Sequence, residues 1–182
     1  HQQAPVEEEL EVGSVILSPG YSLYNPELSP ELGYGRYANV VTSMEFERML
    51  SASGPWGGHL TRRSPDHREP KKIAFLQCVG SRDVHEGAKA YCSGICCTYA
   101  IKEAVVAKEH SKEPLDTAIF YIDMRTYGKD FERYYNRAEE AGVRFIKSRI
   151  TEILPGKETG DLLIQYMDET GRRVEEAFDL VV

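Results

Sequence analysis

The chain has 182 residues, of which 41% are hydrophobic and 28% are charged, which suits one good core, or one domain with a sizeable appendage. Its 22 basic and 29 acidic residues give a formal net charge of -7, and the absence of a long basic block argues against nucleic acid as a partner. Because no apolar stretch approaches the ~20 residues of a membrane-spanning helix and the acidic start HQQAPVEEEL is no leader peptide, we expect a cytoplasmic protein without a membrane span.

The N-terminal part of the chain is predicted to hold one strand and one short helix. The segment LEVGSVILSPGY, residues 10–21, has an apolar run that ends in a proline and glycine turn, which is typical of a buried strand leaving a sheet. Within SMEFERMLSASG, Ser43 is predicted to cap a helix. This helix carries Phe46, Met49 and Leu50 on one face.

A polar, turn-forming segment follows at residues 54–72, GPWGGHLTRRSPDHREPKK. Its composition favours a linker or surface arm, which divides the chain near Glu69. We therefore expect residues 1–70 to form a strand and a connecting arm, and residues 71–182 to form the main domain.

The main domain begins with a regular alternation of apolar strands and helical patterns. The alternation predicts strands at residues 71–78, 116–123 and 143–154, and helices at 96–111 and 127–142. Strands that alternate with helices imply right-handed crossovers and a parallel sheet. The sequence thus predicts an α/β fold, a Rossmann-like three-layer domain.

The C-terminal part is predicted to be antiparallel. DLLIQYM, the turn DETGR and RVEEAFDLVV indicate a hairpin in which Gly171 supplies a positive backbone dihedral, followed by a short apolar strand. Because the chain stops on that strand and starts with His-Gln-Gln, we expect it to be a piece of a longer protein.

All four cysteines fall within one short window of the sequence. Cys78 ends the first predicted strand of the main domain, at the sheet edge where open parallel sheets bind ligands. Cys92 lies in the following loop, and Cys96 and Cys97 start the next helix. We therefore expect the four thiols to converge on the first strand-to-helix crevice.

The chemistry of this crevice is open between three alternatives. The loop lacks the GxGxxG fingerprint, so a nucleotide phosphate is not its obvious occupant. Four thiolates are the number that a cubane iron-sulfur cluster needs, and the partial positive charge of a helix N-terminus favours such an anion. The spacing matches neither common ferredoxin pattern, and adjacent cysteines are awkward for a C-x2-C zinc site. A [4Fe-4S] cluster, zinc and structural buried thiols therefore remain as readings of the spacing.

Four stretches of the chain carry a family resemblance: LGYGRYANVVTSMEFERMLSASGP, KKIAFLQCVGSRD, YCSGICCTYAIKEAVVAKEH and IFYIDMRTYGKDFERYYNRAEEAGVRFIKSRITEI. The motifs QCVGSRD and CSxxCC are its most specific parts. By these stretches, nearly the whole chain resembles the A subunit of heterodisulfide reductase, a flavin and iron-sulfur protein of anaerobes.

The resemblance implies a thioredoxin-reductase-like core that carries FAD, several [4Fe-4S] clusters, and partner subunits with electron-input modules. It implies that residues 71–182 correspond to the domain that binds NAD(P)H in thioredoxin reductase, and that the preceding arm leads to an FAD domain. Carried over position by position, it makes Cys78, Cys92, Cys96 and Cys97 cluster ligands. The FAD domain's own glycine fingerprint is missing from the chain.

Two further positions near the cysteines are candidates for cofactor binding. Gly80, Ser81 and Arg82 form a predicted tight turn, in which Arg82 either neutralises cluster charge, contacts a flavin phosphate, or simply pairs with Asp83 at the surface. Asp123 ends a strand where Rossmann proteins place a ribose-binding acid; its alternative role is to cap the following turn.

Other polar and aromatic residues have plainer predicted roles. His85 lies in the cysteine loop and is expected to be solvated rather than to replace a thiolate. Tyr134 and Tyr135 are expected to pack their helix against the core, and Trp56 is predicted to be exposed on the arm, where it is available to a partner.

We hypothesise from the sequence that the chain is the electron-transfer portion of an oxidoreductase of the heterodisulfide reductase type. In this hypothesis a [4Fe-4S] cluster relays electrons to or from FAD, and the chain by itself has no turnover. The alternative is a module without redox chemistry that binds a nucleotide or docks partner subunits around a zinc or metal-free thiol site.

Overall fold

The computed structural model describes residues 5–158 and 160–182. The elements in this part of the chain are the 3-10 turns η1 (Pro26–Leu28) and η2 (Pro30–Leu32), the helices α1 (Ser43–Leu50), α2 (Cys96–His110) and α3 (Phe131–Glu140), and the strands β1 (Lys72–Leu76), β2 (Asp116–Tyr121), β3 (Val143–Lys147), β4 (Ile153–Pro155), β5 (Leu162–Met167), β6 (Arg173–Phe178) and β7 (Leu180–Val181). No described helix has both the length and the apolar character needed to cross a bilayer.

The centre of the molecule is a four-stranded sheet in the order β3-β2-β1-β7, with every neighbouring pair parallel. Residues buried on both faces of β2 give it a continuous apolar run, as expected for a strand inside a parallel sheet. Helix α2 links β1 to β2, and α3 links β2 to β3. The predicted strand–helix alternation and its parallel sheet are therefore confirmed.

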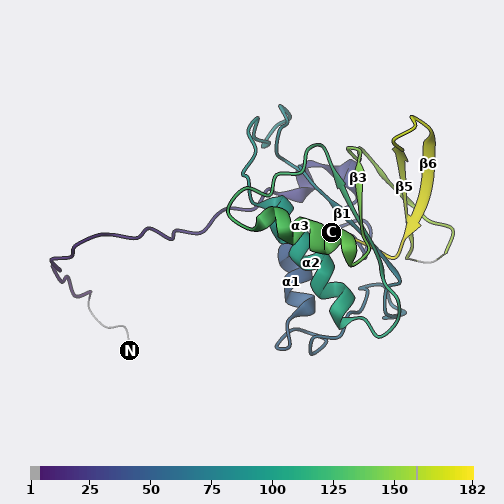
Figure 1. Ribbon diagram of the computed structural model, residues 1–182. Coiled ribbons are helices and arrows are strands. Elements are labelled where there is room, and N and C mark those ends of the chain that lie inside the picture. The colour runs from purple at the N-terminus through teal and green to yellow at the C-terminus, as the bar shows by residue number, and fades with distance from the viewer. Residues whose placement is uncertain (1–4, 159) are drawn as a thin grey trace.

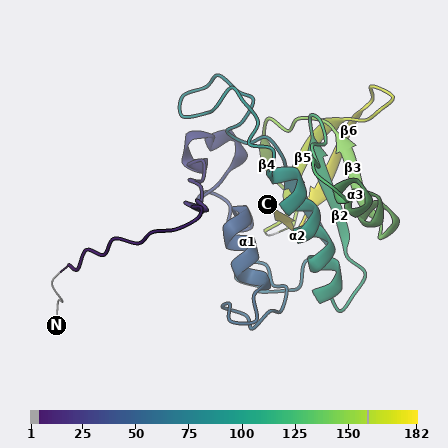
Figure 2. The same ribbon diagram turned by 60° about the vertical axis from the view of Figure 1, so that its left-hand side comes forward.

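A second sheet, in the order β4-β5-β6, is antiparallel and forms a third layer. Successive residues of a strand point to opposite faces, so Ile73 and Phe75 of β1 pack against the helices while Ala74 packs against the second sheet. Figures 1 and 2 show the helices on one side of the parallel sheet and β5 and β6 on the other. The Rossmann-like three-layer prediction is thus confirmed, including the hairpin, where Gly171 has a φ of 79°.

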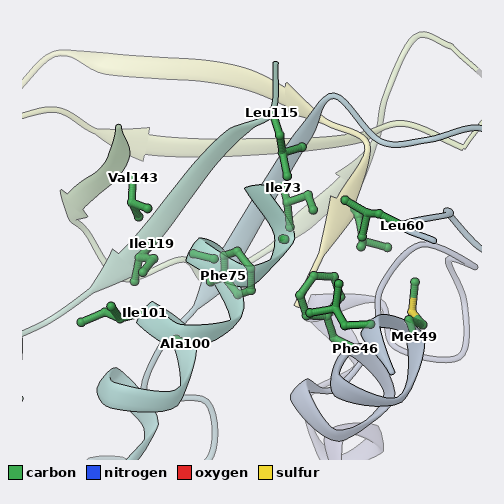
Figure 3. Packing of buried hydrophobic residues seen from close by; sticks show 14 of the residues in the cluster. Phe46, Met49, Leu60, Ile73, Phe75, Ala100, Ile101, Leu115, Ile119 and Val143 are labelled. Carbon is green, nitrogen blue, oxygen red and sulfur yellow. The ribbon is translucent and has the colours of Figure 1, made fainter. Parts of the chain in front are cut away.

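The larger core lies between the helices and the parallel sheet (Figure 3). Phe46 of α1 meets Phe75 of β1 edge to face, with ring centroids 5.5 Å apart. Ile101 of α2 and Ile119 of β2 are both fully buried in the same cluster. Burying each such side chain contributes about 1.5–3 kcal/mol to the stability of the fold. These contacts therefore hold α1 and α2 against the parallel sheet that carries Cys78 at its edge.

Helix α1 begins one residue earlier than its predicted cap implies. Thr42, not Ser43, is the cap: its side chain accepts a hydrogen bond from the Glu45 amide at 3.3 Å, and the Glu45 carboxylate accepts one from the Thr42 amide at 2.8 Å. This reciprocal capping box satisfies two amides, whereas Ser43 is already helical. The prediction of Ser43 as cap was wrong.

Residues before the main domain join its core. The Val41 amide donates a hydrogen bond to the Val181 carbonyl at 2.9 Å, and Val40 bridges Val181 in parallel. Leu60 is 3% and Arg62 1% exposed, so the prediction of a purely surface arm is wrong at these two residues. The division of the chain near Glu69 stays a prediction.

The guanidinium of Arg62 explains how a charged residue is buried in this segment. It pairs with Asp66 at 2.5 Å, with Asp161 at 2.8 Å and with Asp179 at 3.2 Å. A buried cation is tolerated when it is paired and hydrogen-bonded in this way. The cluster ties residues 62–66 to the ends of both sheets.

Two predicted strands differ in the structure. Residues 10–21 form no strand, and Ile16 and Leu17 are 89% and 83% exposed. Figure 1 shows this segment leading away from the three layers. A strand needs a partner, and none of the described strands pairs with it. The single strand predicted at 143–154 is divided between β3 and β4, which belong to different sheets.

Candidate functional site

Cys78 lies two residues beyond β1, at the carboxyl edge of the parallel sheet. Its side chain is buried, and its φ of 63° lies in the left-handed region, which residues other than glycine rarely adopt. Such a conformation persists only where the surrounding structure holds it, and it is common at functional sites. The predicted position of Cys78 at the end of the strand is confirmed.

The other three cysteines are also where the sequence places them. Cys96 and Cys97 are the first two residues of α2, and Cys97 is only 2% exposed, with its sulfur 3.9 Å from the carbonyl oxygen of Asp123. Cys92 is half-buried in the preceding loop, where its sulfur accepts a hydrogen bond from the Gly94 amide at 3.3 Å.

The charges of these thiols act on one another. Burial raises the pKa of Cys78, and negative charge at Cys96 and Cys92 raises it further. The interaction between the two neighbouring thiols raises the pKa of Cys96 and lowers the pKa of Cys97, as expected when a Cys96 thiol donates to a Cys97 thiolate. The four sulfurs therefore share one neighbourhood at the sheet edge.

The side chains are not arranged as ligands. Within residues 5–158 and 160–182, no group of three or more His, Cys, Asp or Glu side chains is placed so as to hold a metal ion. All four cysteines are free of disulfide bonds. Four thiols at one sheet edge fit a cluster or a zinc ion by donor chemistry and number, while their orientations do not preform either one.

The turn after Cys78 requires glycine. Gly80 has a φ of 67°, and a Cβ at this position would clash with the Tyr24 ring. Ser81 follows in an isolated bridge to Lys89, which closes the segment between Cys78 and Cys92. The predicted tight turn is confirmed, and it packs closely against the arm.

Arg82 points to Asp123 rather than to Asp83. Its Nη1 donates to Asp123 Oδ2 at 2.8 Å, so the plain surface pair predicted with Asp83 is wrong. The Arg82 guanidinium holds the pKa of the Asp123 carboxyl below its usual value. It also lowers the pKa of the Cys78 thiol, against the larger effect of burial. The Asp123 carboxylate is thus paired with the Arg82 guanidinium beside the thiols.

Asp83 has partners of its own at the surface. Its carboxylate pairs with Arg149 and accepts from the ring of His85, whose side chain is 83% exposed. The prediction that His85 is solvated is confirmed. Tyr134 and Tyr135 pack against the helical core as predicted, whereas Trp56 is half-buried on that core and not exposed.

A cavity of about 550 Å³ opens beside Cys78 and Cys96. Its walls come from the carboxyl end of β1, the first half of α2, the start of α1, residues 21–34 and the C-terminal Val181 and Val182. We call it the β1–α2 cavity.

Two polar residues in the wall of the β1–α2 cavity were missed by the sequence analysis. Gln77 Oε1 and Glu103 Oε2 are buried and have no hydrogen-bond partner in the described part of the chain. Burial raises the pKa of Glu103 to about 8, and the negative charge of Glu47 adds to this. Helical spacing was the available signal, because Glu103 lies on the same face as the buried Ala100 and Ala107.

These observations define the class of protein. The chain is a Rossmann-like α/β domain whose first strand-to-helix crevice carries thiols where a dinucleotide-binding domain carries glycines.

Curated relatives identify the family. The chain is 46% identical over 182 residues to an iron-sulfur A subunit of CoB–CoM heterodisulfide reductase from Methanopyrus kandleri, covering 99% of this chain and 27% of the relative. It is 44% identical over 184 residues to the iron-sulfur A subunit of CoB–CoM heterodisulfide reductase from Methanocaldococcus jannaschii, covering 100% of this chain and 28% of the relative. The chain belongs to the family of heterodisulfide reductase A subunits, and it spans about a quarter of the length of these relatives.

No protein-family model matches the chain. Among solved structures, thioredoxin reductase of Lactococcus lactis is similar with a TM-score of 0.39 at 17% identity, covering 63% of this chain and 30% of that one.

Proposed function

We propose that this chain is an electron-transfer portion of a heterodisulfide-reductase-type oxidoreductase, and that Cys78, Cys92, Cys96 and Cys97 hold a [4Fe-4S] cluster. The observation that carries the proposal is the gathering of all four thiols at one sheet edge, with charges that act on one another. The relatives from Methanopyrus kandleri and Methanocaldococcus jannaschii are named iron-sulfur subunits, which supports iron over zinc.

The surroundings of the thiols suit an anionic group. Cys96 and Cys97 lie in the first turn of α2, where unpaired amides carry partial positive charge. Arg82 adds a full positive charge next to Cys78, and Asp123 holds its guanidinium in place. In the proposal, Gly80 and Ser81 shape the turn that aims this cation at the bound group.

A bound cluster supplies one-electron transfer, and the chain's residues set the conditions for it. Burial of Cys78 and Cys97 excludes water from two of the proposed ligands. A low local dielectric strengthens the effect of Arg82 on the stored charge. The positive φ of Cys78 gives this strand-end residue a backbone conformation that residues other than glycine rarely adopt.

The rest of the proposal concerns the whole protein. We infer that the intact protein carries FAD, exchanges electrons between this flavin and the thiol-bound cluster, and works in the cytoplasm with other heterodisulfide-reductase-type subunits and electron-input modules. Relatives are named as subunits of such reductases, for example the ferredoxin/F(420)H(2)-dependent CoB-CoM heterodisulfide reductase of Methanosarcina acetivorans. The chain alone is expected to accept electrons without turnover.

Anaerobic reconstitution with ferrous iron and sulfide tests the cluster. We expect about four iron and four sulfide per chain, and an EPR signal after reduction with dithionite. Cys78→Ser and Cys97→Ser should each abolish the four-iron form. Ser93→Ala, in the same loop but without a thiol, is the matched control and should load normally.

Two outcomes would contradict the proposal. One equivalent of tightly bound zinc without a cluster signal favours the alternative, a docking module around a metal site. Saturable NADH binding that Asp123→Asn weakens and that competes with reconstitution favours a nucleotide in the crevice.

A further inference from the structure

Resting on the cluster proposed above, we propose that Glu103 is a proton-binding site coupled to that redox centre. When the centre takes one electron from a donor, the Glu103 carboxylate takes up one proton from solvent. When the electron leaves, the carboxylic acid releases the proton. The electron passes from the donor through the centre to the flavin of the proposed function, the proton comes from solvent and returns to it, and no bond to carbon or sulfur changes.

Glu103 and the proposed ligand Cys96 lie on the same face of α2. Glu103 follows Cys96 by seven residues, which is about two helical turns and roughly 10 Å at 1.5 Å per residue. Both residues line the β1–α2 cavity, so they face the same side of the helix. At this distance, in a partly buried setting, one added negative charge at the thiols acts strongly on a carboxylate.

The Glu103 carboxyl is buried without a hydrogen bond to one of its oxygens. Glu103 is 1% exposed, and its Oε2 has no hydrogen-bond partner in the described part of the chain. A buried carboxylate without a donor is costly, and protonation removes most of that cost. A pKa raised to about 8 agrees with this geometry, and it places the change between the protonated and the charged carboxyl at mildly alkaline pH.

Hydroxyl groups share the cavity with Glu103. The residues that line the β1–α2 cavity include Thr42, Ser43 and Tyr99 as well as Glu103. The cavity therefore holds hydroxyls that can pass hydrogen bonds in the same space as the buried carboxylate.

Other charged and titratable groups around Glu103 do not replace it. Glu47 on α1 raises the pKa of Glu103, whereas Lys102 on α2 lowers it, and these two side chains pair with each other at 2.7 Å. Tyr99 and Cys96 of α2 and Tyr21 of the arm are titratable groups that line the same cavity. Among these groups, Glu103 is the carboxyl that is fully buried in the cavity wall.

The midpoint potential of the reconstituted chain, measured against pH, tests the inference. We expect the midpoint potential to fall above about pH 8 and then to level off. The total fall should be about 59 mV if reduction raises the proton affinity of Glu103 tenfold. Glu103→Gln should remove this slope. It should match the wild type at acidic pH and have the higher potential at alkaline pH, because it carries no negative charge. Glu109→Gln, an exposed acid on the same helix, should keep the slope.

Infrared spectroscopy gives a second readout. The reduced-minus-oxidised spectrum of the wild type should show a protonated carboxyl band that Glu103→Gln loses and Glu109→Gln keeps. If the wild-type cluster has a pH-independent potential and its difference spectrum lacks the carboxyl band, the inference about Glu103 is wrong while the proposed function stands. This result needs no variant, so it holds even if Glu103→Gln fails to fold. A chain that cannot be loaded with a cluster overturns the proposed function and this inference together.

Discussion

Arg82 and Asp123 join the loop after β1 to the end of β2, with the guanidinium nitrogen 2.8 Å from the carboxylate oxygen. The pair is only partly shielded, since the side chains are 25% and 45% exposed. The pair fixes one positive charge beside Cys78, on the sheet edge where four thiols gather. It also engages Asp123 at the position where a nucleotide-binding domain offers an acid to a ribose.

Arg82→Gln is expected to raise the pKa of the Cys78 thiol, because the guanidinium favours the thiolate. Alkylation requires the thiolate, so the rate at which iodoacetamide labels Cys78 in the metal-free protein should fall by roughly two- to tenfold near neutral pH. Mass spectrometry of the labelled peptide measures this rate. Arg149→Gln, which removes the partner of Asp83 instead, should leave the rate unchanged. Equal labelling of wild type and Arg82→Gln would contradict the assigned role.

Arg62→Ala is expected to destabilise the fold strongly. The substitution leaves the Asp161 and Asp179 carboxylates, 17% and 14% exposed, without their buried cation. Breaking a buried ion pair from one side costs about 3–5 kcal/mol in the free energy of unfolding. Urea denaturation measures the loss.

The neighbouring Arg63 provides the matched control for Arg62. Its pair with Glu45 has side chains 42% and 34% exposed, and such surface pairs contribute about 0–1 kcal/mol. Arg63→Ala should therefore have a small effect. Similar losses for both variants would show that residues 62–66 do not anchor the two sheets.

Acid is expected to weaken the hairpin of β5 and β6. The Thr170 hydroxyl and the Arg172 amide donate to Asp168 and lower its pKa to about 2. A carboxyl whose pKa is lower in the folded than in the unfolded protein stabilises the folded state. This contribution is fully present at pH values above 3.8, the pKa in the unfolded chain, and it is lost as the pH falls toward 2. The free energy of unfolding should therefore drop over this range.

Asp168→Asn tests that assignment. Because the amide does not titrate, the variant should lose less stability than the wild type between pH 5 and pH 2, when both are measured by urea denaturation at each pH. The pKa of Asp66 is also lowered, by its hydrogen bonds from Arg62 and Ser64, so part of the acid sensitivity should remain. An unchanged pH profile in Asp168→Asn would show that the turn carries no such contribution.

Local patterns predicted the elements whose partners are close in sequence. Gly171 signalled the hairpin, and Cys78, Cys96 and Cys97 were placed at a strand end and a helix start, as found. The errors involve distant partners. Arg62 looked like a surface residue until Asp161 and Asp179, about a hundred residues later, surrounded it.

Glu103 was missed at the candidate site for a similar reason. It is an ordinary helix residue by composition, and the packing of α1, α3 and β2 against α2 is what makes it a buried acid. Residues 10–21 have the pattern of a strand, but a pattern cannot supply the partner strand.

Gly80→Ala is expected to destabilise the turn that carries Arg82. An alanine costs about 1–2 kcal/mol at this left-handed φ of 67°, and its Cβ would clash with the Tyr24 ring. Gly171→Ala is the matched control, since its φ is 79° but nothing lies within 4 Å. Thermal unfolding should show the larger loss for Gly80→Ala. Adding Tyr24→Ala to Gly80→Ala should remove the clash and reduce the loss of stability to that of Gly171→Ala. If the double variant is no more stable than Gly80→Ala, the loss comes from the backbone conformation alone.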